Sequence, residues 1–207
     1  MNIQDIPYII YAEETPNPSS IKFVANKLLL VSGATAEYRS ASETKDAPIA
    51  QKLFGFPFVK SIFIASNFIT ITKHEHVEWE EIRDELRVFI TNYLNKGNAI
   101  ITKLPEQSVA KDSSFKETIS VNTQHSPPSN DVENKIIEVL EQYIRPAVEQ
   151  DGGLITFKEL KDGKVTVQMR GSCSGCPSST MTLKAGIEAL LKRLLPDHVK
   201  EVVSEAV

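Results

Sequence analysis

Residues 105–130 form a polar segment that divides the 207-residue chain into two parts. Only five of these 26 residues are apolar, against 41% of the whole chain, and the segment ends in Ser126-Pro127-Pro128-Ser129. A stretch of this composition buries too little apolar surface to offset the entropy of ordering it. We therefore predict a flexible linker of roughly 25 to 30 Å average span, which joins small domains at 7–97 and 131–205 and lets them reorient.

The N-terminal part alternates short apolar runs with two helical patterns. Strands are predicted where Ile, Phe, Val and Thr accumulate, and helices where apolar residues recur every three or four positions. A turn is expected at Thr15-Pro16-Asn17-Pro18. The expected elements are strands at 8–12, 21–24, 57–65 and 68–72 and helices at 48–54 and 78–95. This mixture predicts a small α+β domain.

The C-terminal part reads as helix, hairpin, helix and strand, which is a second small α+β unit. Pro146 lies inside the first helical pattern and is expected to make its last turn irregular. Asp151-Gly152-Gly153 is expected to end that helix, and Asp162-Gly163 favours a tight hairpin turn. The expected elements are helices at 131–147 and after Pro177 and strands at 154–160, 165–170 and 199–203.

Charge and hydropathy exclude several function classes. The net charge is −4 and the sequence pI about 5.7, whereas nucleic-acid binding needs a basic surface, so we expect no nucleic-acid partner. No apolar run approaches the roughly 18 residues of a membrane span, so no membrane association is expected. The residues before Lys22 lack the character of a signal or transit peptide. A cytoplasmic protein, in a compartment that keeps thiols reduced, is the expectation.

The chain has only two cysteines, Cys173 and Cys176, and they lie in a loop between a strand and a helix. At this spacing two thiols can converge on one metal atom or form one disulfide, and spacing alone does not choose between them. Gly171 and Gly175 allow the backbone to curl around a bound sulfur or anion. Pro177 suits the first helical position, which would place Cys176 where the helix dipole favours a thiolate.

Two thiolates are half of what a zinc or iron–sulfur site usually requires. The four histidines, at positions 74, 76, 125 and 198, all lie outside the cysteine loop. A second copy of the chain could supply the missing pair across a twofold axis. Metal binding would then be coupled to dimerisation, and a site at such an interface would be exchangeable.

The chain carries several longer motifs around and before the cysteine pair. Those of the C-terminal part are Ile144-Arg145-Pro146-Ala147-Val148, Asp151-Gly152-Gly153, Gly171-Ser172-Cys173-Ser174-Gly175-Cys176-Pro177-Ser178-Ser179, Thr182-Leu183-Lys184 and Gly186-Ile187-Glu188. Those of the N-terminal part are Thr15-Pro16-Asn17-Pro18, Lys22-Phe23, Phe68-Ile69-Thr70-Ile71-Thr72-Lys73 and Trp79. Together these motifs resemble the Nfu-type iron–sulfur scaffold proteins. The similarity to the NifU C-terminal-like domain covers about 132–203, and a further similarity to the family's N-terminal domain covers about 11–96.

The resemblance implies that Cys173 and Cys176 bind a labile [4Fe–4S] cluster shared between two chains. It further implies that the protein is a scaffold rather than an enzyme, that it receives the cluster from cluster-donating assembly machinery, and that it passes the cluster to apo iron–sulfur client proteins. Homodimer formation on cluster binding follows. Transfer would proceed by thiolate exchange with an acceptor site.

Other interpretations of these residues remain open. The cysteine pair could be the redox dithiol of a dithiol–disulfide oxidoreductase, or could hold zinc between two chains. His74 and His76 are more typical of a solvated loop than of a metal site. Arg170 and Lys184 could offset the charge of a thiolate cluster, and Asp151-Gly152-Gly153 is expected to form a turn rather than contact a cluster.

Overall fold

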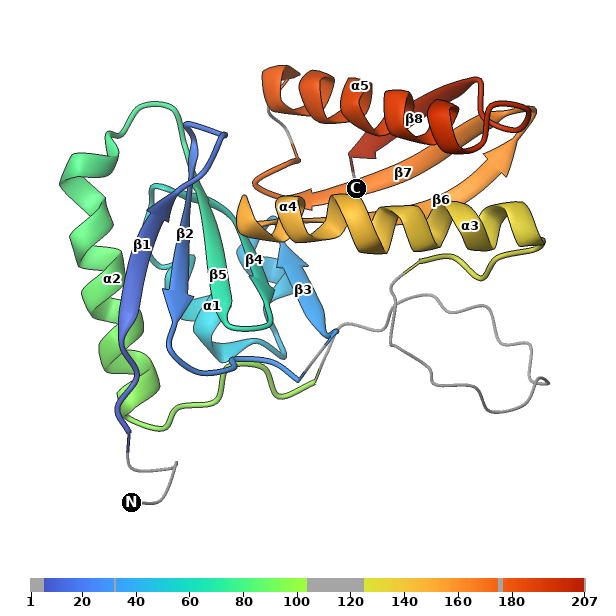
Figure 1. Cartoon of the computed structure of the whole chain (residues 1–207). Coiled ribbons are helices and arrows are strands. Elements are labelled where there is room, and N and C mark those ends of the chain that lie inside the picture. The colour runs from blue at the N-terminus through green and yellow to red at the C-terminus, as the bar shows by residue number, and fades with distance from the viewer. Residues whose placement is uncertain (1–5, 32, 104–124, 175–176, 207) are drawn as a thin grey trace.

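The computed structural model describes residues 6–31, 33–103, 125–174 and 177–206 (Figure 1). It contains two α+β regions, which confirms the predicted fold class. Most of the predicted linker at 105–130 lies outside the described residues, and the domain boundaries at 97, 131 and 205 stay a prediction. No helix in the described part of the chain is long and apolar enough to cross a membrane.

The N-terminal region is a five-stranded antiparallel sheet with the strand order β1-β2-β5-β4-β3. Its strands are β1 (Ile10–Glu14), β2 (Ser20–Ala25), β3 (Thr35–Tyr38), β4 (Val59–Ala65) and β5 (Phe68–Lys73). Its helices are α1 (Pro48–Leu53) and α2 (Trp79–Asn95), and a short 3-10 turn covers Ala41–Glu43. The predicted strands and helices are present. Strand β3 is an addition that the sequence patterns did not predict.

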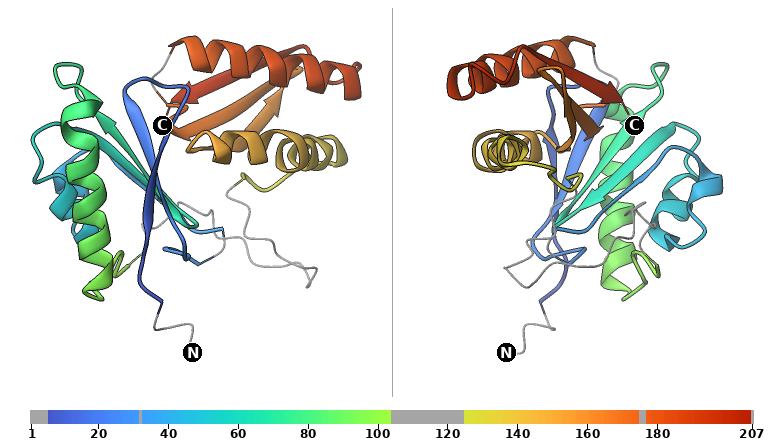
Figure 2. Two further views of the ribbon diagram at one scale, coloured as in Figure 1. Left: turned by 60° about the vertical axis from the view of Figure 1, so that its left-hand side comes forward. Right: turned by 90° about the vertical axis from the view of Figure 1, so that its right-hand side faces the viewer.

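Alternation along the strands sends one set of side chains to the helices and the other set to the opposite face. The helix-facing set includes Ile62, Ile64 and Ile71, which form one core with Leu86 and Ile90 of α2. Helices α1 and α2 lie on this side of the sheet, and the C-terminal region lies on the other (Figure 2). Both faces of the N-terminal sheet are therefore covered.

The C-terminal region has a three-stranded sheet of order β6-β7-β8, in which β7 and β8 are parallel. Its core joins residues of both helical segments to the sheet, for example Ile136, Val167 and Ile187. The elements are α3 (Asp131–Val139), a π-helical turn (Leu140–Ile144), α4 (Arg145–Gln150), β6 (Gly153–Lys161), β7 (Lys164–Gly171), α5 (Pro177–Leu194) and β8 (Glu201–Ala206).

Local sequence signals act here as predicted. Pro146 follows the π-helical turn, because its ring and its missing N–H do not fit a regular helix interior. Asn130 caps α3 by accepting a hydrogen bond from the Glu133 backbone N–H at 2.9 Å. Asp162 and Gly163 form the β6–β7 turn with φ angles of 53° and 82°.

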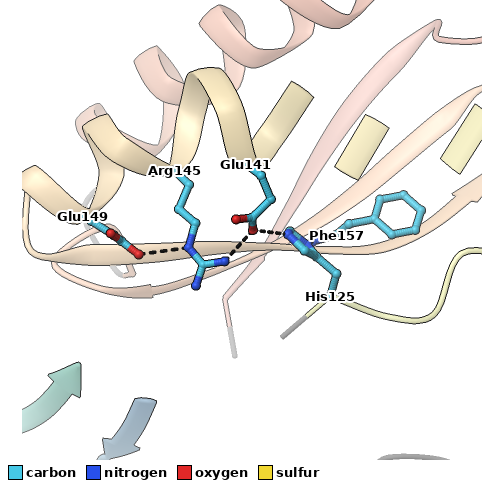
Figure 3. A network of polar contacts seen from close by, with 5 residues as sticks. All are labelled: His125, Glu141, Arg145, Glu149 and Phe157. Atoms are coloured by element: carbon cyan, nitrogen blue, oxygen red, sulfur yellow. Dashed lines mark hydrogen bonds and ion pairs between the residues drawn. The ribbon is translucent and has the colours of Figure 1, made fainter. Parts of the chain in front are cut away.

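A polar network ties the start of the C-terminal region to its first helices (Figure 3). The His125 side chain is 1% exposed; its Nδ1 accepts from the Phe157 backbone N–H at 2.7 Å and its Nε2 lies 2.5 Å from Glu141. Arg145 bridges Glu141 and Glu149. The last residues of the predicted linker, from His125 onward, are thereby fastened to β6 rather than left flexible.

Candidate functional site: the cysteine loop

The cysteine loop, residues 171–176, follows β7 directly, and α5 begins at Pro177. Gly171 has a φ of 68°, a left-handed conformation that turns the chain away from the strand and that glycine adopts without strain. The Ser174 backbone N–H and side-chain hydroxyl both donate to the Gly171 carbonyl, at 3.1 and 2.9 Å. The predicted strand–loop–helix setting is confirmed, while the predicted ligand Cys176 lies outside the described residues.

Cys173 is 6% exposed and belongs to the core of the C-terminal region. Gly153 makes room for it, because a Cβ atom at Gly153 would lie 2.8 Å from the Cys173 Sγ. A cleft of about 390 Å³ reaches this cysteine. Its walls combine residues from both regions: Pro16, Asn17, Asp151, Ser172, Cys173, Thr182 and Leu183. Cys173 therefore lines an opening that the N-terminal region helps to form.

Asp151-Gly152-Gly153 forms the second wall of the site. Gly152 has a φ of 79° and reverses the chain between α4 and β6, as predicted. Its carbonyl accepts from the Ser172 backbone N–H at 3.2 Å, and the Ser172 hydroxyl donates to the Asp151 carbonyl. Burial raises the pKa of Asp151, and the nearby Lys22 ammonium opposes that rise. The turn thus holds Ser172, the residue that precedes Cys173, through two hydrogen bonds.

Three side chains of the N-terminal region donate hydrogen bonds to backbone carbonyls of this site. Asn17 Nδ2 donates to Ser172 at 3.0 Å. Thr70 Oγ1 donates to Gly152 at 2.7 Å, and Lys22 Nζ to Gln150 at 3.1 Å. All three donors belong to motifs that the sequence associated with the N-terminal domain. Their proximity to the cysteine loop was not predicted.

Glu37, on the unpredicted strand β3, lies against the same loop. Its carboxylate is near the Gly171 backbone N–H at 3.4 Å and the Ser174 hydroxyl at 3.5 Å, and its side chain is 10% exposed. Burial raises the pKa of Glu37, while Arg39 and the Gly171 N–H act against that rise. The positive charge of Arg170 also opposes the rise in the pKa of Glu37.

The remaining candidate residues do not complete a metal site. His74 and His76 stack on one another with ring centroids 5.7 Å apart. Within the described ranges, no group of three or more His, Cys, Asp or Glu side chains is arranged to hold a metal ion. His74 and His76 lie in the loop between β5 and α2. A role for Lys184 beside the cysteine loop stays a prediction.

Within the described residues, one thiol lines a cleft whose walls come from both regions of the chain. A single thiol is too few ligands for a stable metal centre. A second ligand from the same loop and a pair from another molecule would meet the requirement. The site is therefore incomplete within the described part of one chain.

Family models match both parts of the chain. Residues 10–97 match the model described as "Scaffold protein Nfu/NifU N terminal", and residues 136–203 match the NifU-like domain. These ranges contain the N-terminal sheet with α2 and the cysteine loop with its surrounding strands and helices.

Curated relatives extend over nearly the whole chain. A protein of Drosophila willistoni named "NFU1 iron-sulfur cluster scaffold homolog, mitochondrial" is 35% identical over 199 residues, which cover 95% of this chain and 64% of the relative. The Drosophila ananassae protein of that name is 33% identical, with 91% and 61% covered. The chain thus spans somewhat less than two thirds of these relatives.

Among solved structures, a NifU-like protein from Saccharomyces cerevisiae is 28% identical and has a TM-score of 0.43, with 50% of this chain and 91% of that one covered. With an Nfu N-terminal region followed by a NifU-like region, the chain belongs to the Nfu/NifU scaffold family.

Proposed function

We propose that this protein is an iron–sulfur cluster scaffold that carries a labile [4Fe–4S] cluster between two chains and delivers it to apo-proteins. The observation that carries the proposal is the Cys-x-x-Cys pair at the strand-to-helix loop of a NifU-like domain. The curated relatives are named iron–sulfur cluster scaffold homologues. Cys173 and Cys176 are the proposed ligands.

Two copies of the chain are needed because each supplies only two thiolates. A cubane cluster takes four cysteine ligands, so Cys173 and Cys176 of both protomers would complete the set. A closed twofold arrangement presents identical loops to each other, which gives both halves the same ligand geometry. Cluster binding and homodimer formation are then one equilibrium.

Delivery follows from ligand exchange rather than from catalysis. A thiolate of an acceptor protein forms a new bond to a cluster iron as the bond from Cys173 or Cys176 breaks, and the released scaffold thiolate takes up a proton. Repetition moves the cluster to a site with more, or better enclosed, ligands. No substrate is chemically converted by the protein, so we propose a carrier rather than an enzyme. Its partners are cluster-donating machinery and apo iron–sulfur clients.

Anaerobic reconstitution with iron, sulfide and a reductant tests the proposal. We expect about half a cubane per chain, about two irons and two sulfides, together with a dimer in mass measurement of the same sample. Cys173→Ser and Cys176→Ser should each abolish cluster retention, and Ser174→Ala should not. A chain that incorporates no inorganic sulfide, or a monomeric Cys173→Ser variant that keeps a full cluster, would contradict the assignment.

The same experiment separates the alternatives. A dithiol oxidoreductase would hold no iron and would show a defined two-electron potential with turnover on protein disulfides. A zinc-bridged dimer would take up zinc without sulfide. The cytoplasmic location stays a prediction, because the relatives are named as mitochondrial proteins. Fluorescence imaging of the tagged full-length gene product decides the compartment.

A further inference from the structure

The N-terminal sheet contacts the cysteine loop through a surface that is built for it. We call this surface the docking face; it consists of Lys22, Val24, Glu37, Phe63, Ala65, Phe68 and Thr70, on the side of the sheet opposite α1 and α2. Thr70 is 1% exposed and Phe63 is 2% exposed. Phe63, Ala65 and Phe68 share an apolar cluster with Leu154 of β6. A solvent-facing sheet surface does not ordinarily carry two buried phenylalanines.

Polar contacts of the docking face, together with Asn17, are directed at the backbone of the site. The carbonyls of Gln150, Gly152 and Ser172 each accept a side-chain hydrogen bond from the N-terminal region. These carbonyls bracket the Asp-Gly-Gly turn and the residue before Cys173. Separation of the two regions would leave all three without these donors, so the contact has a preferred register rather than being a general apolar association.

Two glycines of the site allow this approach. A Cβ atom at Gly171 would lie 2.9 Å from the Phe63 ring, and one at Gly152 would lie 2.8 Å from Thr70 Oγ1. Both glycines also have a positive φ. The backbone of the cysteine loop and its neighbouring turn is therefore in direct contact with the docking face, with no side chain between them.

From these contacts we infer that the docking face holds the cysteine loop in the cluster-free chain, and that it must separate from the loop before a second chain can share a cluster at Cys173. The first part stands on the contacts alone, and the second rests on the proposed function. Pro16 and Asn17 line the cleft that leads to Cys173. A second loop that brings its own thiolates to the same cluster must enter through this cleft, where the N-terminal region now lies.

Thiol reactivity in the iron-free protein tests the docking. The parent is the reduced full chain carrying Cys176→Ser, so that Cys173 is the only thiol. Phe68→Asp places a charge in the docked apolar cluster and leaves the helix-facing core untouched. The matched control is Tyr11→Asp, since Tyr11 lies on β1 of the same sheet and is 58% exposed. We measure the second-order rate of Cys173 alkylation by N-ethylmaleimide, with small-angle scattering on each sample.

We expect Phe68→Asp to react about tenfold faster or more, because alkylation then reports a larger open population, and to scatter as separated regions. Tyr11→Asp should match the parent in both measurements. Equal alkylation rates in all three proteins would overturn the inference, as would a parent that already scatters as two separated regions. If Phe68→Asp does not fold, Thr70→Val combined with Asn17→Ala removes two donors without adding a charge and takes its place.

Reconstitution kinetics test the second part, with both cysteines present. The Phe68→Asp chain should form the cluster-bridged dimer faster than the Tyr11→Asp chain. Equal rates would overturn the gating role while leaving the scaffold function intact. Failure of every chain to take up iron and sulfide would overturn the proposed function, and with it the gating, while the alkylation result would still decide the docking.

Discussion

At the residue scale, Glu37 and the glycines near Cys173 lie at the contact between the cysteine loop and the N-terminal sheet. A loop that faced only solvent would not require a buried carboxylate or these close backbone contacts. Gly152 and Gly171 combine a left-handed φ with contact to the N-terminal sheet, so each meets two constraints at once. Burial raises the pKa of Glu37, so holding its ionised carboxylate near the loop lowers the stability of the folded chain at neutral pH. Because the buried Glu37 carboxyl titrates differently in the folded and unfolded chain, the stability of this interface should depend on pH.

Replacement of Glu37 tests this cost. A carboxyl whose folded-state pKa is raised binds its proton more tightly in the folded state, so its contribution to stability is lost as pH rises from about 4.5 through the folded pKa. Glu37→Gln should therefore increase the free energy of unfolding at neutral pH and flatten its pH dependence, measured by urea denaturation. Glu80→Gln, on the exposed surface of α2, is the control; an equal effect of both variants would contradict the explanation.

At the element scale, the start of the C-terminal region depends on side chains that bond to backbone groups. Asn130 caps α3, and Glu133 in turn accepts from the Ser129 backbone N–H at 2.6 Å. His125 accepts from the Phe157 N–H of β6 and meets Glu141 on the π-helical turn. These contacts hold the last residues of the predicted linker, 125–130, against the C-terminal region.

Loss of the α3 cap should have a measurable cost. Asn130→Ala leaves the Glu133 N–H without its acceptor and is expected to lower the free energy of unfolding by about 1 kcal/mol. Ser129→Ala keeps its backbone donor and should change stability little. Chemical denaturation of both variants checks this, and a neutral Asn130→Ala would indicate that water replaces the cap without loss.

The His125 contacts should respond to pH. Burial lowers the pKa of His125 from its ordinary 6.5, and Glu141 only partly opposes this. The unfolded chain therefore takes up a proton first, so the free energy of unfolding should fall as pH drops below about 6.5 and level off below the folded pKa. His125→Gln should weaken this dependence and the exposed His198→Gln should preserve it. Persistent Phe157 amide protection across that range would count against the mechanism.

At the scale of the whole molecule, the two regions form one body through a mixed interface. Hydrogen bonds to backbone carbonyls give it orientation, and the cluster of Phe63, Phe68 and Leu154 gives it apolar burial. The predicted freedom to reorient is thus opposed, in this structure, by specific contacts. Under the proposed function, this arrangement would cover the Cys173 thiol while the protein holds no cluster and would open before a cluster is shared.

Docking should couple the unfolding of the two regions. In calorimetry we expect the intact chain to unfold in one transition, because the interface links the two cores. Phe68→Asp should split this into two transitions, while Tyr11→Asp should keep one. A parent that already shows two independent transitions would mean that the contacts are too weak to hold the regions together.

The sequence by itself was enough for most of the helices and strands, the two α+β regions and the cysteine pair, because periodicity, turn residues and thiol spacing are local properties. It was silent on β3, whose four residues are too few for a clear pattern. Asn17, Glu37 and Thr70 join the site only in three dimensions, across separations of up to 155 residues. One signal was present: Phe63 and Phe68 alternate with core isoleucines, which indicates a sheet buried on both faces. What covers the second face depended on the mutual placement of two folded regions, which a local pattern does not encode.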